Sequence, residues 1–366
     1  MSISGAQTLN ATRFDDTARA YDALLVLSFG GPEGPDDVIP FLENVTRDRN
    51  IPRERLEEVA EHYLHFGGIS PINAQNRALI AALEPELQAH GTNMPIYFGN
   101  RNWEPFVADT IRQMRADGVT RTLVFVTSTF SSYSGCRQYR EDVIRALESL
   151  PEDEQDQIAF DKIRVFYNHP GFIEAQADRI RAALAQFPTE RRAAVEVIFT
   201  AHSIPLAMAK GSAYEAQLRD ACRLVAEAAR TPNYRLAYQS RSGSPMIPWL
   251  EPDILDELDG LHAAGKDDVI VAPIGFISDH MEVLFDLDEE AAEKAASLDM
   301  TMVRAATVGT HPTFVAMIRE LIQERLTASP ERRALGSRGP NHDICPLNCC
   351  LRGEGRPSTP SGSTNH

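Results

Sequence analysis

The chain has 366 residues, of which 43% are hydrophobic and 24% charged, and it carries a formal net charge of −16. This composition is typical of a soluble globular protein of about two domains, and it excludes a disordered chain, a collagen-like repeat and a small disulfide scaffold. The acidic balance argues against nucleic acid or anionic lipid as a partner. No run of about 18 apolar residues occurs, so no stable membrane anchor is expected.

Short apolar runs alternate with helix-like segments along the first half of the chain. The predicted strands cover residues 23–29, 94–99, 120–128 and 161–168, and the predicted helices cover 36–48, 54–65, 73–90, 104–117 and 137–149. These strands are almost continuously apolar, as expected for strands that are buried on both faces of a parallel sheet.

The second half repeats this rhythm. Strands are predicted over 194–202, 234–240, 267–276 and 300–308, and helices over 171–186, 213–229, 253–264, 281–296 and 312–327. The alternation predicts an α/β protein with two doubly wound parallel sheets. We expect an N-terminal extension (1–20), a first domain (21–168), a second domain (169–310), a C-terminal helix (311–327) and a tail (328–366).

The two ends of the chain differ from the globular part in composition. The first 20 residues have neither a basic nor an apolar region, so they do not resemble a secretory signal, and a cytoplasmic location is expected. The tail is rich in Gly, Pro, Ser and Arg and is expected to be disordered unless something ties it down.

Polar residues follow two of the predicted strands of the second half. His202, in AHSIP, stands where a strand breaks into a loop, and its imidazole can bind a metal, accept a proton or make a structural hydrogen bond. In GFISDHMEVLFDLDEE, the carboxylates Glu282, Asp286 and Glu290 are spaced so that they share one helical face. They form either a solvated acidic surface or a ladder that carries cations or protons, because oxygen ligands suit a hydrated divalent ion.

Two further segments are candidate binding loops. In FGGISPINAQN, Ser70 and Pro71 fit the cap and the first position of a helix, whose N-terminus attracts anions. A plain cap is the alternative. YQSRSGSPMIPWL is a loop dense in Gly, Ser and Pro that ends near Trp249, and it could line an apolar planar pocket or join two domains.

The five cysteines are unevenly placed. Cys345, Cys349 and Cys350 form a C-x3-C-C pattern in the tail, and Cys136 follows a predicted strand. Cys222 lies inside a predicted helix and is expected in the apolar core of the protein. Four thiolates suit a [2Fe–2S] cluster or a structural zinc ion, and the adjacent cysteine pair favours the cluster. Idle tail thiols are the remaining alternative.

Together these segments resemble the ferrochelatase family. AHSIP, YQSRSGSPMIPWL and GFISDHMEVLFDLDEE are similar to three family signatures in the family's order, and LVLSFGGPE and GGISPI are similar to two more, so the resemblance runs from about residue 21 to 327. The C-x3-C-C tail and the surroundings of Cys136 resemble the actinobacterial branch. This resemblance implies an enzyme, a lyase that inserts Fe²⁺ into coproporphyrin III to form coproheme in haem biosynthesis.

The resemblance also implies the fold and the roles of residues. It implies the chelatase fold, with two Rossmann-like domains and the porphyrin in the cleft between them. His202 and Glu282 would be catalytic and face each other at the substrate iron, and Asp286 and Glu290 would form a path for protons or iron. The porphyrin contacts would be Ser70 and Tyr139 near the propionates, with Phe29 and Trp249. The ligands of a structural [2Fe–2S] cluster would be Cys136, Cys345, Cys349 and Cys350.

Some points distinguish this chain or stay open. Many related bacterial enzymes have Tyr at the position of Phe29, and a phenylalanine cannot ligate iron. The runner-up function is a related chelatase that takes Co²⁺, Ni²⁺ or protoporphyrin IX, and another class is a non-catalytic haem-binding protein. Transient contact with neighbouring enzymes of haem biosynthesis is also expected.

Overall fold

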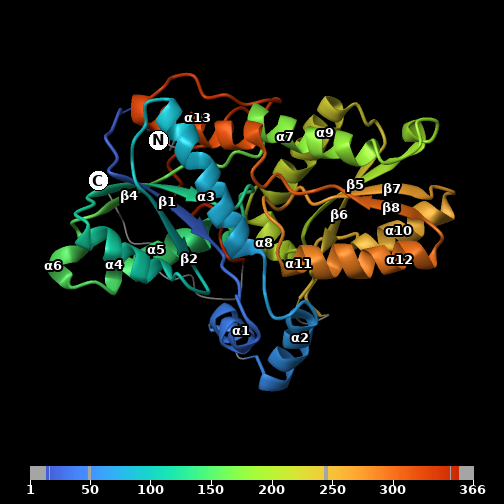
Figure 1. Ribbon diagram of the computed structural model, residues 1–366, viewed down its shortest axis with the longest axis horizontal. Helices are drawn as coiled ribbons and strands as arrows, with labels where there is room; N and C mark the ends of the chain where they lie inside the picture. The colour runs from blue at the N-terminus through green and yellow to red at the C-terminus, as the bar shows by residue number, and fades with distance from the viewer. Residues whose placement is uncertain (1–13, 16, 48–50, 243–245, 347, 354–366) are drawn as a thin grey trace, which may run out of the picture.

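The protein contains two four-stranded parallel sheets, each flanked by helices (Figure 1). The computed structural model describes residues 14–353 apart from 16, 48–50, 243–245 and 347. The first sheet has the order β2-β1-β3-β4 and the second the order β6-β5-β7-β8. The strands are β1 (Ala23–Ser28), β2 (Ile96–Asn100), β3 (Arg121–Val126), β4 (Ala159–Lys162), β5 (Glu196–His202), β6 (Tyr234–Gln239), β7 (Asp268–Ala272) and β8 (Thr301–Arg304). The α/β class is confirmed, and the shared strand order fits the alternation of strands and helices that the second half repeats.

Most helices begin and end within a few residues of the predicted positions. They are α1 (Val38–Thr46), α2 (Arg53–His65), α3 (Ile72–Ala89), α4 (Val107–Ala116), α5 (Gln138–Glu148), α6 (Glu152–Gln155), α7 (Pro170–Leu184), α8 (Leu206–Lys210), α9 (Tyr214–Ala229), α10 (Ile254–Ala263), α11 (Met281–Val283), α12 (Ala292–Ser297) and α13 (Pro312–Thr327). Short 3-10 turns, η1 (Pro35–Asp37) and η3 (Arg192–Ala194), and π-helical turns, η2 (Tyr133–Arg137) and η4 (Leu284–Ala291), complete the order. The sequence prediction missed α6, α8 and both π-helical turns.

Three strands are only about half as long as predicted. The strand predicted over 267–276 covers only Asp268–Ala272. The strand predicted over 161–168 pairs with β3 only over Ala159–Lys162, and the one predicted over 300–308 is paired only over Thr301–Arg304. Residues 163–168 are buried and mostly apolar, but they leave the sheet and pass beside α13, where the Arg164 side chain binds Glu324. An apolar run therefore marks burial here without marking sheet pairing.

One apolar core joins the two sheets. It contains Val26 and Phe125 from the first sheet and Val197 and Phe199 from the second. Helix α13 packs against both α3 and α7, so the C-terminal helix contacts helices from both halves of the chain. The domain boundary near residue 168 stays a prediction, because the core is continuous across it.

The tail that follows α13 is tied to the body by polypeptide contacts. Asn168 Nδ2 donates hydrogen bonds to the carbonyl oxygens of Leu335 and Gly339 at 3.1 and 2.8 Å. Further along, the buried carboxylate of Asp343 forms an ion pair with the guanidinium of Arg325, at an N–O distance of 3.3 Å. Arg137, on η2 of the first half, also donates a hydrogen bond to the carbonyl oxygen of Cys349 at 3.3 Å. Residues 354–366 of the predicted tail lie outside the described part of the chain.

The buried ion pair between Arg164 and Glu324 gives a first prediction. Arg164 is 1% exposed and donates to both carboxylate oxygens of Glu324 at 2.7 and 2.8 Å. Arg164→Met leaves that carboxylate buried without its partner, so the free energy of unfolding should fall by about 3–5 kcal/mol. The free energy of unfolding of each variant is measured by urea unfolding. Arg219→Met removes an exposed pair with Glu215 and should cost no more than about 1 kcal/mol. Equal losses in the two variants would contradict the prediction.

No helix within the described residues is long and apolar enough to cross a membrane.

Candidate active site and cysteine cluster

Side chains from three neighbouring strands meet at the carboxyl edge of the second sheet. His202 is the last residue of β5, and Gln239 is the last residue of β6, directly opposite it in register. The segment after β7 crosses the end of β5, where Gly275 N donates to Thr200 O at 3.0 Å. A Cβ on Gly275 would lie 2.8 Å from the Cα atom of Ala201, so only glycine permits this crossing. Ligands of open α/β sheets bind at this edge.

The structure brings His202 and Glu282 together. His202 Nε2 lies 3.4 Å from Glu282 Oε1, and the two side chains are 31% and 41% exposed. Burial disfavours both charged forms, but Glu282 raises the pKa of His202 to about 9. Against the same burial cost, His202 lowers the pKa of Glu282 to about 2. The resting pair is therefore ionic at neutral pH, and its exposure allows water to screen it.

His280 positions Glu282 from the other side. Its ring caps α11, since Glu282 N donates to His280 Nδ1 at 3.2 Å, and the same nitrogen lies 3.9 Å from Glu282 Oε2. The ring also packs nearly perpendicular to that of Phe276, with the two centroids 4.4 Å apart. Burial lowers the pKa of His280, so this imidazole is neutral where His202 is charged. Neither the cap nor this neighbour was identified in the sequence, although His280 stands within the quoted motif.

The helix predicted over 281–296 is interrupted by the π-helical turn η4, which carries Asp286 and Glu290. Its wider turn is typical of functional sites. Asp286 accepts hydrogen bonds from Ser240 Oγ and from Gln239 Nε2, the latter at 3.3 Å. Burial raises the pKa of Asp286 to about 7. Glu290 is exposed, so the three carboxylates lead from the half-buried His202–Glu282 pair to the surface.

Helix α2 of the first half contacts this acidic helix. The His62 ring stacks on Phe285 with the centroids 3.9 Å apart, and His65 Nε2 lies 3.3 Å from Glu289 Oε2. The first half of the chain therefore faces the second at the carboxylate ladder. This contact was not predicted, because nothing in the local sequence of α2 marks its partner.

The pKa of Asp286 gives a second prediction. Because burial raises it to about 7 from a model-compound value of 3.8, the folded protein binds this proton more tightly than the unfolded chain does. Its ionisation should therefore destabilise the folded state progressively as the pH rises from about 4 to about 7. Asp286→Asn removes that penalty, so the variant should gain stability over the wild type, on the order of a few kcal/mol, across this range.

Urea unfolding at several pH values between 4 and 8 measures this difference. Glu290→Gln, at the exposed end of the ladder, should show the same sign with a much shallower slope, since water solvates that carboxylate. A stability difference between Asp286→Asn and wild type that stays flat over the range would contradict the prediction.

The proposed porphyrin contacts occupy different environments. Ser70 is buried beside the Gly31 turn, and its hydroxyl does not cap α3, which begins at Ile72 without a side-chain cap. The predicted capping role of Ser70 is therefore wrong, since the helix starts one residue late. Tyr139 is buried beneath the Arg101 guanidinium, 4.7 Å from the ring centroid. Phe29 is half-buried under the same guanidinium at 5.7 Å.

Trp249 is half-buried in the second half of the chain. Its backbone forms an isolated antiparallel bridge with Pro205, the last residue of AHSIP. Its indole Nε1 is buried and has no hydrogen-bond partner among the described residues. No finding assigns a ligand to Ser70, Tyr139, Phe29 or Trp249, so their contacts with porphyrin stay predictions.

The four cysteines proposed as ligands converge from distant parts of the chain. Cys136 lies on η2, after β3, and Cys345, Cys349 and Cys350 reach it from the tail. Cys349 Sγ and Cys350 Sγ are 3.4 Å apart. Hydrogen bonding with Cys136 lowers the pKa of Cys345, and hydrogen bonding with Cys345 lowers that of Cys349. All four are free thiols, while Cys222 is buried in the core as predicted.

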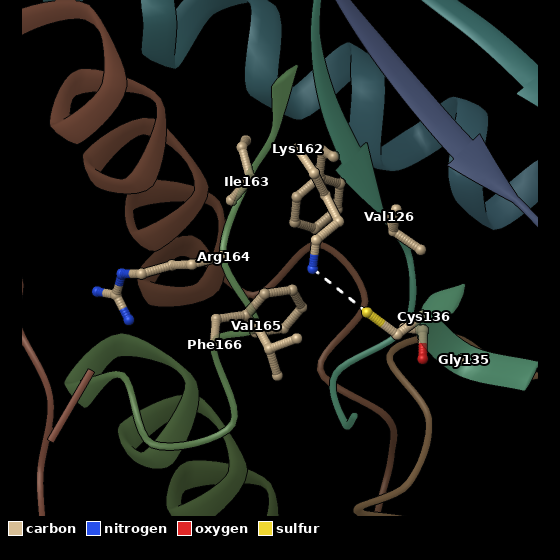
Figure 2. A pocket seen from close by; sticks show the side chains of 10 residues that line it. Val126, Gly135, Cys136, Lys162, Ile163, Arg164, Val165 and Phe166 are labelled. Carbon is tan, nitrogen blue, oxygen red and sulfur yellow. Dashed lines mark hydrogen bonds between the residues drawn. The ribbon is translucent and has the colours of Figure 1, made fainter. Parts of the chain in front are cut away.

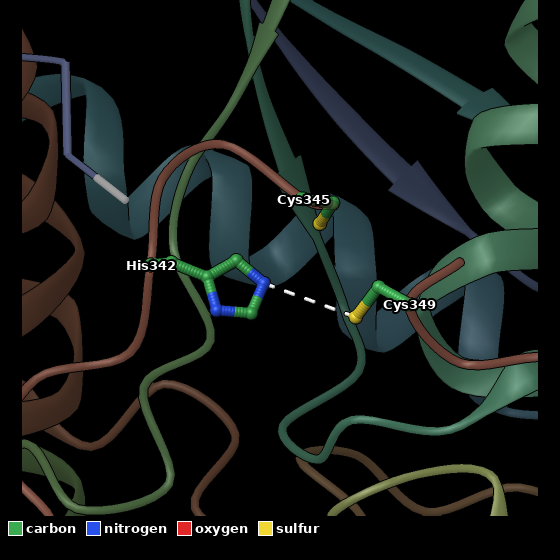
Figure 3. A group of neighbouring side chains, drawn as sticks. All are labelled: His342, Cys345 and Cys349. Atoms are coloured by element: carbon green, nitrogen blue, oxygen red, sulfur yellow. Dashed lines mark hydrogen bonds between the residues drawn. The ribbon is translucent and has the colours of Figure 1, made fainter. Parts of the chain in front are cut away.

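Two residues near these thiols were not identified from the sequence. His342 Nε2 lies 3.9 Å from Cys349 Sγ, and the ligand atoms of His342, Cys345 and Cys349 lie within 4.8 Å of one another (Figure 3). Lys162, at the end of β4, donates a hydrogen bond from Nζ to Cys136 Sγ, and the two atoms are 3.4 Å apart (Figure 2). His342 could have been predicted as a neighbour of the thiols from its spacing, because it precedes Cys345 by three residues. Lys162 could not, because only the fold brings it to the tail.

A solved structure shares this two-sheet arrangement. The sirohydrochlorin chelatase SirB from Bacillus subtilis subspecies spizizenii, in complex with cobalt, matches with a TM-score of 0.51. The match covers 84% of this chain and 96% of that one. Because the sequence identity is 11%, it shows a shared fold and nothing about function. The fold is that of the chelatases, with two Rossmann-like units.

Sequence comparison is more specific. The profile of the ferrochelatase family matches residues 21–326. A ferrochelatase of Rhodopirellula baltica is 56% identical over 343 residues, which cover 93% of this chain and 97% of that protein. Coproporphyrin III ferrochelatases of Streptomyces griseus and Streptomyces coelicolor are each 51% identical, over 90% and 93% of this chain and 93% and 96% of theirs. The chain belongs to the ferrochelatase family, whose members are metal-chelating lyases.

Proposed function

We propose that this protein inserts Fe²⁺ into coproporphyrin III and releases two protons, which gives coproheme for haem biosynthesis. The observation that carries the proposal is the His202–Glu282 pair, 3.4 Å apart at the carboxyl edge of the second sheet, with a carboxylate ladder leading away from it. The choice of coproporphyrin III as the substrate rests on the actinobacterial relatives, which are named coproporphyrin III ferrochelatases.

The reaction replaces two pyrrole N–H protons by the substrate iron. A planar macrocycle hides its nitrogen lone pairs, so a site that holds it distorted uses binding energy to expose them. In this proposal His202 and Glu282 ligate the incoming iron or accept the leaving protons. Asp286 can take up and release a proton near neutral pH, since its pKa is about 7, and Glu290 can pass it to solvent.

Arginines near Tyr139 bear on how a tetracarboxylate would be held. Asp142 engages the guanidinium groups of Arg101 and Arg47, the latter at 3.3 Å, so part of their charge is already balanced. The other arginine of the basic segment VTRDRN between the first two helices, Arg49, lies outside the described residues. With a net charge of −16, the protein as a whole repels an anionic porphyrin, and local donors must offset that field.

The donor set at the tail fits a [2Fe–2S] cluster. Four thiols gather there, which is the ligand set such clusters take, and a lysine ammonium next to Cys136 can offset their negative charge. We propose that Cys136, Cys345, Cys349 and Cys350 would hold the cluster. It would supply a cross-link that fastens the tail to η2, because metal binding contributes folding free energy.

We also propose a cytoplasmic location, which suits a protein whose five cysteines are all free thiols. Transient contacts with neighbouring enzymes of haem biosynthesis, which would pass on the porphyrin, belong to the same proposal.

An anaerobic assay with purified protein tests the proposed reaction. Fe²⁺ is supplied with coproporphyrin III or protoporphyrin IX, and Co²⁺ and Ni²⁺ are tried in parallel, because ligand affinity alone does not favour Fe²⁺ over these ions. We expect faster turnover with Fe²⁺ and coproporphyrin III. Faster turnover with protoporphyrin IX, or with Co²⁺ or Ni²⁺, would support the runner-up chelatase instead.

A further inference from the structure

A lysine points at the cysteine cluster from the edge of the first sheet. Lys162 is the last residue of β4, and its Nζ lies 3.4 Å from Cys136 Sγ. The preceding residue, Asp161, pairs with Arg121 and Arg325, whereas Figure 2 shows the Lys162 side chain turned towards Cys136. Successive side chains of a strand point to opposite faces, which separates these two charges. Among the described residues, Lys162 makes no ion pair with a carboxylate.

The surroundings make this placement costly unless a negative group balances it. Lys162 lines a small cavity together with Phe125, Val126 and Ile163, which are apolar (Figure 2). An ammonium removed from water without a partner carries a penalty of several kcal/mol. The four thiols are the groups within reach that become anionic when they ligate a metal. The lysine is therefore matched to a loaded cluster better than to free thiols.

The choice of residue is also unusual for this chain. Only four of its 36 basic residues are lysines, and the others are arginines. Arginine presents a planar fork for carboxylates, whereas lysine is a compact point charge on an apolar stem. The single Sγ atom of Cys136, with apolar side chains around the lysine stem, suits the ammonium.

We propose that Lys162 donates a charge-assisted hydrogen bond to the cluster sulfur of Cys136, and that it thereby raises the reduction potential of the cluster and slows its loss. This inference rests on the [2Fe–2S] cluster of the proposed function. One-electron reduction adds one negative charge to the cluster, so a neighbouring cation stabilises the reduced form more than the oxidised form. Lys162 acts through Cys136 as a positioning residue and takes no part in iron insertion.

The test compares Lys162→Met with the wild type in the full-length protein. Methionine keeps the length and apolar character of the stem and removes the charge and the donor. Iron and acid-labile sulfide are measured first, and the midpoint potential is then obtained by anaerobic titration followed by visible absorbance. We expect Lys162→Met to have a lower midpoint potential than wild type and to lose its cluster absorbance several-fold faster in air.

Three further variants keep the test informative. Lys162→Arg retains the charge and should lie closer to the wild type. Lys162→Gln retains a donor without the charge, should lie between wild type and Lys162→Met, and replaces the latter if it does not fold. Lys266→Met removes a surface lysine that pairs with Glu196 and should change nothing.

The outcomes separate this inference from the proposed cluster. If the wild type contains the cluster and the neutral variants match its potential and lifetime, the role of Lys162 is overturned and the cluster stands. If the wild type contains zinc in place of iron and sulfide, the cluster itself is overturned, and the inference falls with it.

Discussion

Replacement of His202 by alanine should lower the rate of iron insertion by about 100-fold or more, the scale expected for the loss of a residue that moves protons at the reacting centre. The side chain ends β5 and faces Glu282 at 3.4 Å. Because it is partly exposed and outside the apolar core, its removal should leave the fold intact. The measurement is the initial rate of coproheme formation under anaerobic conditions, with thermal unfolding as the check on folding.

His262→Ala is a matched control, since His262 is an exposed histidine on α10 that pairs with Asp267 at 3.0 Å. It should keep the wild-type rate. Retention of a near-wild-type rate by His202→Ala with a normal unfolding curve would remove His202 from the mechanism.

The pH profile provides a second readout of the same pair. Glu282 is the main group that raises the pKa of His202 to about 9, against the opposing effect of burial. A histidine that binds iron must first lose its proton. Glu282→Gln should therefore move the acidic limb of the rate profile towards lower pH, in addition to any loss of rate. A profile that keeps its position would show that this proton does not limit the reaction.

The second large effect is expected at the cysteine cluster. Cys136→Ala removes the one proposed ligand that comes from outside the tail, so the purified variant should carry no cluster iron or sulfide above background and lack the absorbance beyond the porphyrin bands. The tail should become sensitive to proteases near residues 345–350. Residues 335–339 should remain protected, because Asn168 binds their carbonyl groups independently of the cluster.

Cys222→Ala is the control for this experiment. Cys222 is a buried free thiol on α9, apart from the cluster, so its variant should keep full cluster content despite a small cavity in the core. Metal and sulfide analysis distinguishes the two. A Cys136→Ala protein with unchanged iron and sulfide would contradict the proposed ligand set.

The sequence predicted those parts of the fold that depend on the hydrophobic pattern of each strand and helix. Two parallel sheets and the positions of most helices follow from apolar strands that alternate with helix-like segments. The pattern indicated only that His202 and Glu282 follow strands, whose carboxyl ends are where ligands bind. That the two side chains face each other was implied by the resemblance to the ferrochelatase family, and the structure places them 3.4 Å apart.

Other features depend on contacts that no local pattern records. The π-helical turn η4 carries the spacing of an α-helix in its sequence, yet it adopts a wider turn between Met281 and Ala292. Residues 163–168 carry the pattern of a strand but leave the sheet to satisfy the Arg164–Glu324 pair. Lys162 lies 187 positions before Cys349 in the chain, and only the folded tail makes them neighbours.

The central claim is that this protein catalyses iron insertion and does more than bind haem. The most direct measurement follows Fe²⁺ and coproporphyrin III with catalytic amounts of protein in an anaerobic, weakly buffered solution, recording coproheme by absorbance and protons with an indicator. The account predicts many turnovers per protein, two protons released per iron inserted, and loss of both signals in His202→Ala. Binding of coproheme by the wild type without turnover would contradict it.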